Sequence, residues 1–460
     1  MKLRHAMRRT RTRIIGMAAA IAMMLPLVVF TPIEGAAAPS ENAVQRWNAT
    51  ALAALFASPA APVPGGGQAA GVGAIHMAMV QGAVYDAVNS IRGKYEPFLD
   101  VPDAPSSASI DAAVITAAHD VLIEVIPMAP PLTDAAVRDA ILARIEDQYT
   151  TELAAIPSDK AMRQGQAAGA AAADAMLADR ADDGTYPEDP FTFTVVTGIG
   201  EWRPTNDAND PFAWVARVRP FTLPSTSKFR TAGPNPVGSD AYTTDYDEVK
   251  AVGAATNSTR TDEQTALATF YIVNPVELFN RTMRTVAADE GLSQAQQARL
   301  FAMLNTAGAD AFINCWDDKA AYSFWRPVTA IQLGDSDDNP ATIGDPEWQP
   351  FISTLPGPQP GSFLPTPPYP DHPSGYNCLT ASMMYTAKRF FGTNDISFTV
   401  TRAAATPETT RDYASFTSVV DDTIDARIFL GIHFRTADVQ GAQLGKQVAG
   451  WIYKRFFRPV

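Results

Sequence analysis

Residues 76–91, with the sequence HMAMVQGAVYDAVNSI, carry apolar side chains at helical spacing, and this pattern begins near Ala70. Apolar residues that recur every three or four positions place one face of a helix against a core. Three Ala-rich segments with similar spacing follow, near residues 107–126, 132–154 and 159–179. Because alanine has the highest intrinsic helix propensity, these segments together predict a helical bundle.

The second half of the chain is also predicted to be helical, after a long irregular stretch. Residues 183–243 are rich in proline and turn signals, which favours an ordered excursion that covers part of the second half. Helical patterning resumes near Thr261, with Asp262 as a candidate cap, and continues with interruptions to about Phe324. Later helices are expected over residues 374–391, 408–430 and 436–457. No β-alternation of any length is present, so the predicted class is all-α, with long Pro-rich loops.

We expect four regions along the chain. They are a signal peptide (1–37), a flexible N-terminal segment (38–69), an N-terminal helical region that includes the Pro-rich excursion (70–255), and a C-terminal helical region with the candidate catalytic residues (256–460). The two helical regions are expected to form one compact unit, since 46% of the 460 residues are apolar and 18% are charged.

The N-terminal residues are typical of an export signal. Residues 1–13 hold six basic side chains, residues 14–30 are almost wholly apolar, and residues 36–38 are small alanines. This pattern predicts a signal peptide cleaved near residues 36–38 and an exported protein, either secreted or in the cell envelope. The pair Arg8-Arg9 suits the twin-arginine route, but its flanks match that signal weakly, so the Sec route stays an alternative.

Cleavage of the signal would leave a strongly acidic protein. Residues 1–37 contain six basic residues and one acidic residue, so their removal lowers the formal net charge from −13 to −18. Such a charge argues against nucleic acid as a partner. No later apolar run reaches the roughly 18 residues that a membrane span requires, so no stable span is expected in the mature chain.

The chain has two cysteines, Cys315 and Cys378. They are too few for a disulfide framework and too far apart in sequence for a zinc motif. In an exported protein they could form a single disulfide bond, and the alternative is two buried thiols.

The first candidate site segment is KAAYSFWRP, residues 319–327. Lys319 and Arg326 are two helical turns apart, so a continuous helix would project both from one face, and Pro327 predicts that this helix ends there. Two cations on one face repel each other unless an anion lies between them. An exposed basic face is the alternative. Three flanking aromatic residues instead indicate a buried setting: Trp316, Phe324 and Trp325.

The second candidate segment is YPDHPSGYN, residues 369–377. Ser374 is placed to cap the helix that follows, and the free N–H groups of a first helical turn point at any anion in front of it. Capping alone would account for this serine. Gly375 adds a further indication, because a backbone without a side chain can approach a ligand closely.

The third candidate segment is RIFLGIHFRTAD, residues 427–438. Six residues correspond to about 240° on a regular helix, so Arg427 and His433 share a face only if Gly431 breaks the helix. Such a break would put His433 on the turn before a new helix. A single histidine is by itself more often structural than functional.

In this order, Lys-x6-Arg-Pro, Pro-Ser-Gly and Arg-x5-His resemble the vanadium-dependent haloperoxidase and type 2 phosphatidic acid phosphatase superfamily. The stretches FWRPVTAI and RIFLGIHFR look like its soluble, secreted bacterial haloperoxidase-like branch. These motifs span about residues 310–450, and VYDAVNSI in the N-terminal half is also similar.

The resemblance implies one pocket for vanadate or phosphate. It implies that five residues hold the equatorial oxygens: Lys319, Arg326, Ser374, Gly375 and Arg427. His433 would be the apical group, as the vanadium ligand in a haloperoxidase or the nucleophile on phosphorus in a phosphatase. Both roles suit one pocket, because trigonal bipyramidal vanadate has the geometry of a phosphoryl-transfer transition state.

The chain departs from the family pattern at two positions. The family has histidine directly after Pro-Ser-Gly, as an acid or base, whereas this chain has Tyr376. A phenol with a pKa near 10 donates hydrogen bonds but transfers protons poorly near neutral pH. His372 would supply an imidazole if the loop folds back, and the alternative is a loop histidine bonded to the backbone. Asp438 lies five residues after His433, where the family has an orienting acid four residues after. It would otherwise be a first-turn acid of a helix capped by Thr436, with a backbone carbonyl orienting His433.

Three functions follow from this resemblance. The first is a haloperoxidase-like oxidoreductase that uses vanadate as cofactor and hydrogen peroxide and halide as substrates. The second is a secreted acid phosphatase, a phosphoric monoester hydrolase without a cofactor, that acts through phosphorylated His433. The third is a non-catalytic phosphate- or vanadate-binding homologue, because Tyr376 replaces the acid–base histidine.

Overall fold

The computed structural model describes residues 41–460, apart from 58–63, 129–133, 206–207, 358–360 and 403–408. Residues Glu41–Val460 form one compact unit, as expected for the two helical regions. The predicted signal peptide lies outside the described residues and stays a prediction.

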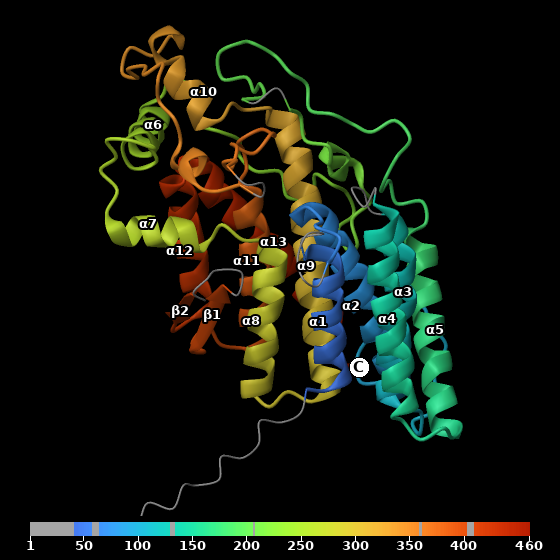
Figure 1. Cartoon of the computed structure of the whole chain (residues 1–460). Helices are drawn as coiled ribbons and strands as arrows, with labels where there is room; N and C mark the ends of the chain where they lie inside the picture. The colour runs from blue at the N-terminus through green and yellow to red at the C-terminus, as the bar shows by residue number, and fades with distance from the viewer. Residues whose placement is uncertain (1–40, 58–63, 129–133, 206–207, 358–360, 403–408) are drawn as a thin grey trace, which may run out of the picture. The chain divides into compact units, whose positions relative to one another are not determined.

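The described residues form thirteen α-helices and one two-stranded sheet, so the predicted helical class is confirmed (Figure 1). The helices of the first half are α1 (Ala43–Phe56), α2 (Ala70–Arg92), α3 (Ile110–Met128), α4 (Ala135–Ala154), α5 (Lys160–Arg180) and α6 (Asp240–Val252). Those of the second half are α7 (Asp262–Phe270), α8 (Pro275–Asp289), α9 (Gln294–Tyr322), α10 (Pro327–Gln332), α11 (Gly375–Phe391), α12 (Phe416–Phe429) and α13 (Arg435–Arg455). The antiparallel strands are β1 (Phe398–Arg402) and β2 (Thr409–Tyr413), and short 3-10 helices cover Ala213–Arg217, Gly334–Ser336 and Phe351–Thr354.

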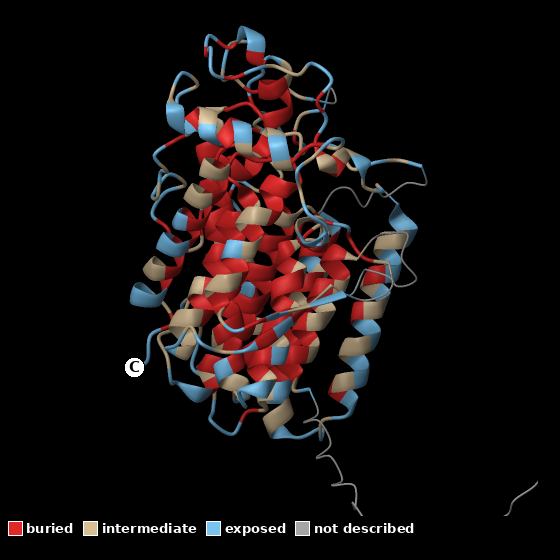
Figure 2. Cartoon of the chain, turned by 90° about the vertical axis from the view of Figure 1, so that its left-hand side faces the viewer, coloured by how far each residue is buried: buried red, intermediate tan, exposed pale blue. Residues whose placement is uncertain are grey.

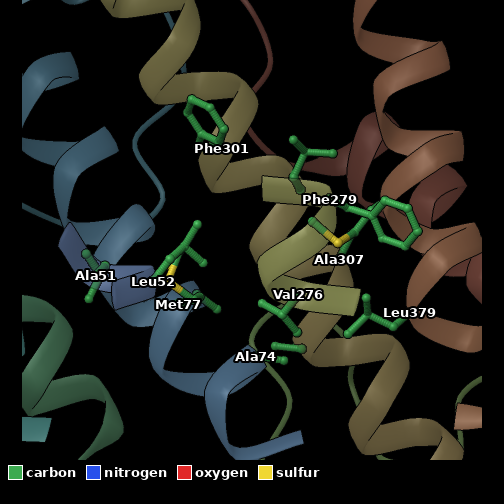
Figure 3. Packing of buried hydrophobic residues seen from close by; sticks show 14 of the residues in the cluster. Ala51, Leu52, Ala74, Met77, Val276, Phe279, Phe301, Ala307 and Leu379 are labelled. Atoms are coloured by element: carbon green, nitrogen blue, oxygen red, sulfur yellow. The ribbon is translucent and has the colours of Figure 1, made fainter. Parts of the chain in front are cut away.

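The 29-residue helix α9 connects the two halves of the molecule. It packs against α1 and α2 on one side and against α8, α11 and α13 on the other. Figure 3 shows side chains from these helices meeting around it, among them Met77, Val276, Phe301 and Leu379. Helix α9 is buried over most of its length, and Figure 2 shows exposed residues mainly on the outer helices and loops. The hydrophobic effect on this shared core therefore holds both halves together.

The prediction of a flexible segment over residues 38–69 is wrong for residues 43–56, which form helix α1. The Asn42 side chain accepts a hydrogen bond from the Gln45 N–H and caps this helix. Trp47 and Leu55 are fully buried in the shared core, so packing explains the order of α1 better than local propensity does.

Three local predictions also need correction. Thr261, not Asp262, caps α7, and Gln264 completes a capping box. The helix expected over 408–430 is instead strand β2 followed by α12, which Ser415 caps. The β-branched pair Thr409-Thr410 favours the strand. The predicted end of α11 at residue 391 is confirmed, and the Gly392 that follows has the left-handed φ of +74°.

The Pro-rich excursion folds along α9 and is held there by side chains of that helix. The Asp310 carboxylate accepts hydrogen bonds from the N–H groups of Phe221 (2.6 Å), Thr222 (2.9 Å) and Leu223 (3.2 Å), and from the Thr222 hydroxyl. One turn later, Asn314 Oδ1 accepts from the Phe229 N–H at 2.9 Å. The expectation of an ordered excursion is confirmed, because these bonds satisfy backbone groups that would otherwise be buried without partners.

Helices α11 and α13 pack side by side in the same direction and approach each other closely. A Cβ on Gly441 would lie 2.7 Å from Ser374 O, and one on Gly445 would lie 2.3 Å from Cys378 O. Since both distances are below van der Waals contact, the backbones can be this close only with glycine at 441 and 445. This packing places the start of α13 beside the start of α11.

Substitution of Asp310 by alanine tests the anchoring of the excursion. We expect Asp310→Ala to lower the free energy of unfolding by about 3 kcal/mol, because it strands several buried donors at once. Chemical unfolding followed by circular dichroism measures this change, with Glu124→Ala on the exposed side of α3 as the matched control. Equal stability of the two variants would show that Asp310 does not anchor the excursion.

Candidate oxyanion site

Lys319 and Arg326 meet at the site from two different helices. The prediction that one helix carries both is wrong, because α9 ends at Tyr322 and Ser323 adopts a left-handed φ of +43°. Arg326 then occupies the N-cap position of α10, with Pro327 as its first residue. The turn between them pairs with the excursion, since the Trp202 N–H donates to Ser323 O at 2.8 Å. Helix α9 therefore ends about one turn earlier than the predicted end before Pro327.

The Lys319 ammonium is fully buried. Its Nζ donates to the carbonyl oxygens of Pro370 (2.6 Å) and Asp371 (3.0 Å). An ammonium has three donors, so one is left for a further acceptor. Burial lowers the pKa of Lys319 to about 8, and the nearby Arg326 adds to this effect. An anion at the site would oppose both effects and favour the charged form.

The Arg326 guanidinium is also fully buried and fixes two loops. Its Nε donates to Tyr369 O at 2.8 Å, and Nη1 donates to Ile432 O at 2.7 Å. Within the part of the chain that the structure describes, Nη2 has no hydrogen-bond partner. A buried donor without a partner is costly, so this atom is placed for an acceptor from a ligand.

The break at Gly431 was predicted correctly and brings Arg427 and His433 together. Helix α12 ends at Phe429, Gly431 has a φ of +77°, and α13 begins at Arg435. A Cβ on Gly431 would lie 2.4 Å from Gly253 O, which also restricts this position to glycine. Arg427 is buried in the last turn of α12, and its Nε has no partner among the described residues.

An acid that the sequence interpretation missed orients His433. The Asp371 carboxylate lies 2.7 Å from His433 Nδ1, and both side chains are buried. Asp371 is the one carboxylate between Glu347 and Asp395 in the sequence, and this isolation was the available signal. The Asp371 side chain, and not a backbone carbonyl as the sequence suggested, therefore orients His433.

Asp438 is the first-turn acid of α13 and does not contact His433 by any hydrogen bond in the described structure. Its Oδ1 accepts from Asn377 Nδ2 at 2.8 Å, and Asn377 in turn accepts from the Thr423 hydroxyl. Thr436 does not cap α13, because the N-cap position belongs to Phe434. Burial raises the pKa of Asp438 well above its usual value, although the nearby Ser374 and Asn377 side chains oppose the rise. Asp438 thus ties α13 to α11 and α12.

The contact between Asp371 and His433 links the protonation states of the two side chains. Burial raises the pKa of Asp371 to about 7, against the opposing charges of Arg326 and Lys319. Burial and then Arg326 lower the pKa of His433 well below its usual value. With two protons on the pair, Nε2 always carries one of them. Loss of one proton as the pH rises through about 7 leaves Nδ1–H donating to the Asp371 carboxylate and Nε2 without a hydrogen. Nε2 then faces Arg326 Nη1, which lies 3.2 Å away.

Ser374 and Gly375 lie at the start of α11, as the sequence predicts. Ser374 occupies the N-cap position without a capping hydrogen bond, and its buried Oγ has no partner of normal geometry among the described residues. A Cβ on Gly375 would lie 2.6 Å from the Trp316 ring. The missing side chain at 375 therefore makes room for Trp316, and a role of the Gly375 N–H in binding a ligand stays a prediction.

Tyr376 supports Arg427. The Arg427 guanidinium lies over the Tyr376 ring, 4.6 Å from its centroid, which is a cation–π contact. Burial raises the pKa of Tyr376 above its usual value, although Arg427 and Arg402 oppose the rise. The phenol is neutral at physiological pH, and its buried hydroxyl has no partner in the described residues. It can donate a hydrogen bond but is a poor base.

His372 lies beside the site as a neutral imidazole. Burial, and then Lys319, lower its pKa to about 3. The Thr231 hydroxyl donates to Asp318 Oδ2 at 2.7 Å, so it must accept from His372 Nε2 at 3.1 Å. The tautomer with hydrogen on Nε2 follows, and Nδ1, which has no partner in the described part of the chain, keeps its lone pair. His372 is thus bonded to a side chain rather than to backbone.

The structure brings the predicted site residues into one cluster. Lys319, Arg326 and Arg427 are buried cations, and two of their own donors, Arg326 Nη2 and Arg427 Nε, have no acceptor among the described residues. Burial raises the pKa of both carboxylates of the cluster, Asp371 and Asp438, which favours their neutral forms. A tetrahedral oxyanion such as vanadate or phosphate would supply the missing acceptors and negative charge, so these residues fit it.

Comparisons with known proteins agree with this arrangement. Residues 299–460 match the family described as the VCPO second helical-bundle domain. These residues contain every member of the cluster. This region of the chain is therefore similar to the vanadium haloperoxidase superfamily.

The chain is also similar to individual members of this superfamily. It is 28% identical over 202 residues to the vanadium chloroperoxidase of Curvularia inaequalis, a match that covers 37% of this chain and 32% of that protein. The chain therefore spans about a third of the length of this curated relative.

Two solved structures share the fold over most of the chain. One is the first bacterial vanadium-dependent iodoperoxidase, with a TM-score of 0.68 and 20% identity over 90% of this chain and 95% of that one. The other is an apo-type bacterial vanadium-dependent chloroperoxidase, with a TM-score of 0.63 and 18% identity over 83% of this chain and 92% of that one.

Two further predictions concern cysteines and membranes. Cys315 and Cys378 are both buried and unbridged, so the structure has two thiols rather than a disulfide. Among the described residues, no helix combines the length and apolarity that crossing a membrane requires.

Substitution of Asp371 tests its role in orienting His433. Asp371→Asn keeps the side-chain size but cannot titrate, so we expect orthovanadate affinity at about pH 8 to fall 10- to 100-fold, the usual effect of removing a ligand's supporting acid. The gain in affinity between about pH 6 and about pH 8 that comes from the pair should also be lost. Calorimetric titration of both proteins measures this, and the protonation of vanadate cancels in the difference.

The matched control is Asp103→Asn, at an exposed loop position. An Asp371→Asn protein with the affinity and pH profile of the unmodified chain would contradict the orienting role.

Proposed function

We propose that this chain binds vanadate and uses hydrogen peroxide to oxidise halide, as a haloperoxidase-like oxidoreductase. One observation carries the proposal: buried donors without acceptors surround an imidazole that Asp371 orients. The named relatives, a chloroperoxidase and an iodoperoxidase, support the same reaction class.

The contacts of the site residues suggest a separate role for each in binding the oxyanion. Lys319, Arg326 and Arg427 neutralise the oxyanion, and the Ser374 hydroxyl adds a neutral donor. His433 would hold vanadate through Nε2, while Asp371 keeps hydrogen on Nδ1. Bound vanadate would supply a Lewis-acidic centre that activates peroxide. The fixed cationic cluster needs no rearrangement to stabilise the added negative charge.

Proton transfer is the weakest part of this site. Tyr376 is a neutral phenol, so it can donate a hydrogen bond to an oxygen but cannot accept a proton near neutral pH. His372 has a free Nδ1 lone pair and can accept a hydrogen bond there, although its pKa of about 3 makes it a weak base. We therefore propose slow halide oxidation at neutral pH.

Substrates would reach the cluster beside α10. A cavity of about 590 Å³ is lined by Val328 and Thr329, which follow Arg326 in the chain, and by Thr366, which comes shortly before Tyr369. Arg203 of the excursion lines the same cavity and adds a positive charge that would attract halide.

A phosphatase is the second candidate, and the contact between Asp371 and His433 favours it. A carboxylate on Nδ1 raises the nucleophilicity of Nε2, as a reaction through phosphorylated histidine requires. The cations that would hold vanadate would equally stabilise the transferred phosphoryl group.

Activity assays with and without orthovanadate separate these functions. We expect vanadate to restore bromination of a phenol dye by peroxide and bromide, and Arg427→Gln to reduce the rate about 100-fold, because it removes a charge from the oxyanion site. Arg92→Gln, at an exposed position of α2, is the matched control.

Hydrolysis of an aryl phosphate is measured on the same samples. Phosphate release that vanadate inhibits would favour the phosphatase. Vanadate binding without either activity would contradict both enzymes and leave a non-catalytic oxyanion-binding protein.

Position 376 offers a gain-of-function test. We expect Tyr376→His to raise the bromination rate at neutral pH about tenfold or more, since an imidazole accepts and releases a proton far nearer neutral pH than a phenol does. Tyr376→Phe keeps an aromatic face under Arg427 and should show no gain. Equal rates for the two variants would show that proton transfer at 376 does not limit the reaction.

A further inference from the structure

A second cationic cavity lies on the other half of the α11 and α13 pair, away from the oxyanion site. Its volume is about 650 Å³, and four of its lining residues are basic: Arg389, Lys446, Lys454 and Arg455. None of the residues of the oxyanion site lines it. We call this cavity the basic groove.

The charges of the basic groove are uncompensated. No carboxylate is among its lining residues, and none of its four cations forms an ion pair within the described residues. The sequence has no acidic residue over 375–394 or over 439–460, although the chain has a net charge of −13. Burial, and then the nearby Asp421 carboxylate, raise the pKa of Tyr385 at the edge of this region. Among the described residues, Asp421 forms no ion pair with any of the four cations. A cationic concavity on an acidic protein therefore attracts anions locally.

One face of helix α13 lines the basic groove and carries a glycine between two lysines. Lys446, Gly450 and Lys454 are four residues apart and share one face of the helix. Glycine inside a helix is about 1 kcal/mol less favourable than alanine, so its presence at 450 calls for a local reason. A Cβ at this position would lie 3.4 Å from Arg389 Nη2, which crosses from α11. That distance is an ordinary van der Waals contact, so a methyl group would fit beside Arg389, whereas a longer side chain at 450 would occupy the groove.

Contacts with aromatic rings and backbone hold the two arginines in place. The Arg455 guanidinium lies over the Trp451 ring at 3.8 Å from its centroid, and Arg389 Nη1 donates to Tyr385 O at 3.0 Å. Held in this way, both arginines would lose less conformational entropy when they bind a ligand than free side chains would.

We propose that the basic groove binds a multiply charged phosphate-type anion. Four cations with no carboxylate between them match several negative groups, and the cavity is larger than one tetrahedral anion fills. The two amides at its rim, Gln443 and Gln447, add neutral donors for such oxygens. The proposal is independent of the chemistry at His433.

Binding of tripolyphosphate to the whole protein, followed by calorimetry at low ionic strength, tests this proposal. We expect one site in the groove that binds tripolyphosphate more tightly than orthophosphate, with an affinity that falls as salt is added. Lys446→Gln with Lys454→Gln should weaken binding about tenfold or more, because two charged contacts are lost. Gly450→Leu, which fills the groove without changing its charge, should also weaken binding.

Two controls separate this site from others. Lys94→Gln with Lys160→Gln changes the charge equally at exposed positions outside the groove, and it should leave binding unchanged. Arg326→Gln alters the oxyanion site alone. Vesicles with phosphatidic acid present the same chemistry from a lipid, and retention by these vesicles that depends on Lys446 and Lys454 would identify a headgroup as the source.

Three results would overturn the proposal. They are no binding of either probe, binding that the groove variants leave intact, and binding lost only in Arg326→Gln. Equal affinity for orthophosphate and tripolyphosphate would also contradict the requirement for several charges.

Discussion

Two buried cations and one short loop determine how the oxyanion site is built. Lys319 donates to the carbonyl oxygens of Pro370 and Asp371, and Arg326 donates to that of Tyr369. These bonds fix the loop that carries Asp371, and Asp371 in turn fixes the His433 ring. The cations thus have a structural role toward the protein and keep single donors for a ligand. Loss of either cation would disturb the ligand site and the orientation of His433 together.

Helix α9 connects this site to the rest of the molecule. Its apolar faces pack in the core between α2 and α11, while Asp310, Asn314 and Asp318 hold the Pro-rich excursion. Lys319 follows directly in the last turns of the same helix. Thr231 of the excursion bonds both Asp318 and His372, so the excursion also sets the tautomer of His372. A Pro-rich stretch without regular structure is therefore part of the support of the site.

Periodicity and spacing predicted the helices and most of the site, but not the local devices that join them. Helix α1 was missed because its order depends on burial of Trp47 and Leu55 against distant helices. The break after Tyr322 was missed because a left-handed serine has no clear sequence signal. The role of Asp371 depends on a contact across 62 positions with His433. No sequence signal indicated that Gly375 makes room for Trp316, 59 positions earlier in the chain. Such pairings depend on tertiary packing, which motif spacing does not encode.

The parallel packing of α11 and α13 gives the two cationic regions different electrostatic surroundings. Both helices begin at the oxyanion site, where their positive dipole ends add to the charges of Lys319, Arg326 and Arg427. Both end near the basic groove, where the negative dipole ends stabilise Lys388, Arg389, Lys454 and Arg455 but oppose an anion. The groove must therefore attract its ligand through exposed side chains alone. Since salt screens such charges far more than buried ones, binding there should be weaker and more sensitive to ionic strength than binding at His433.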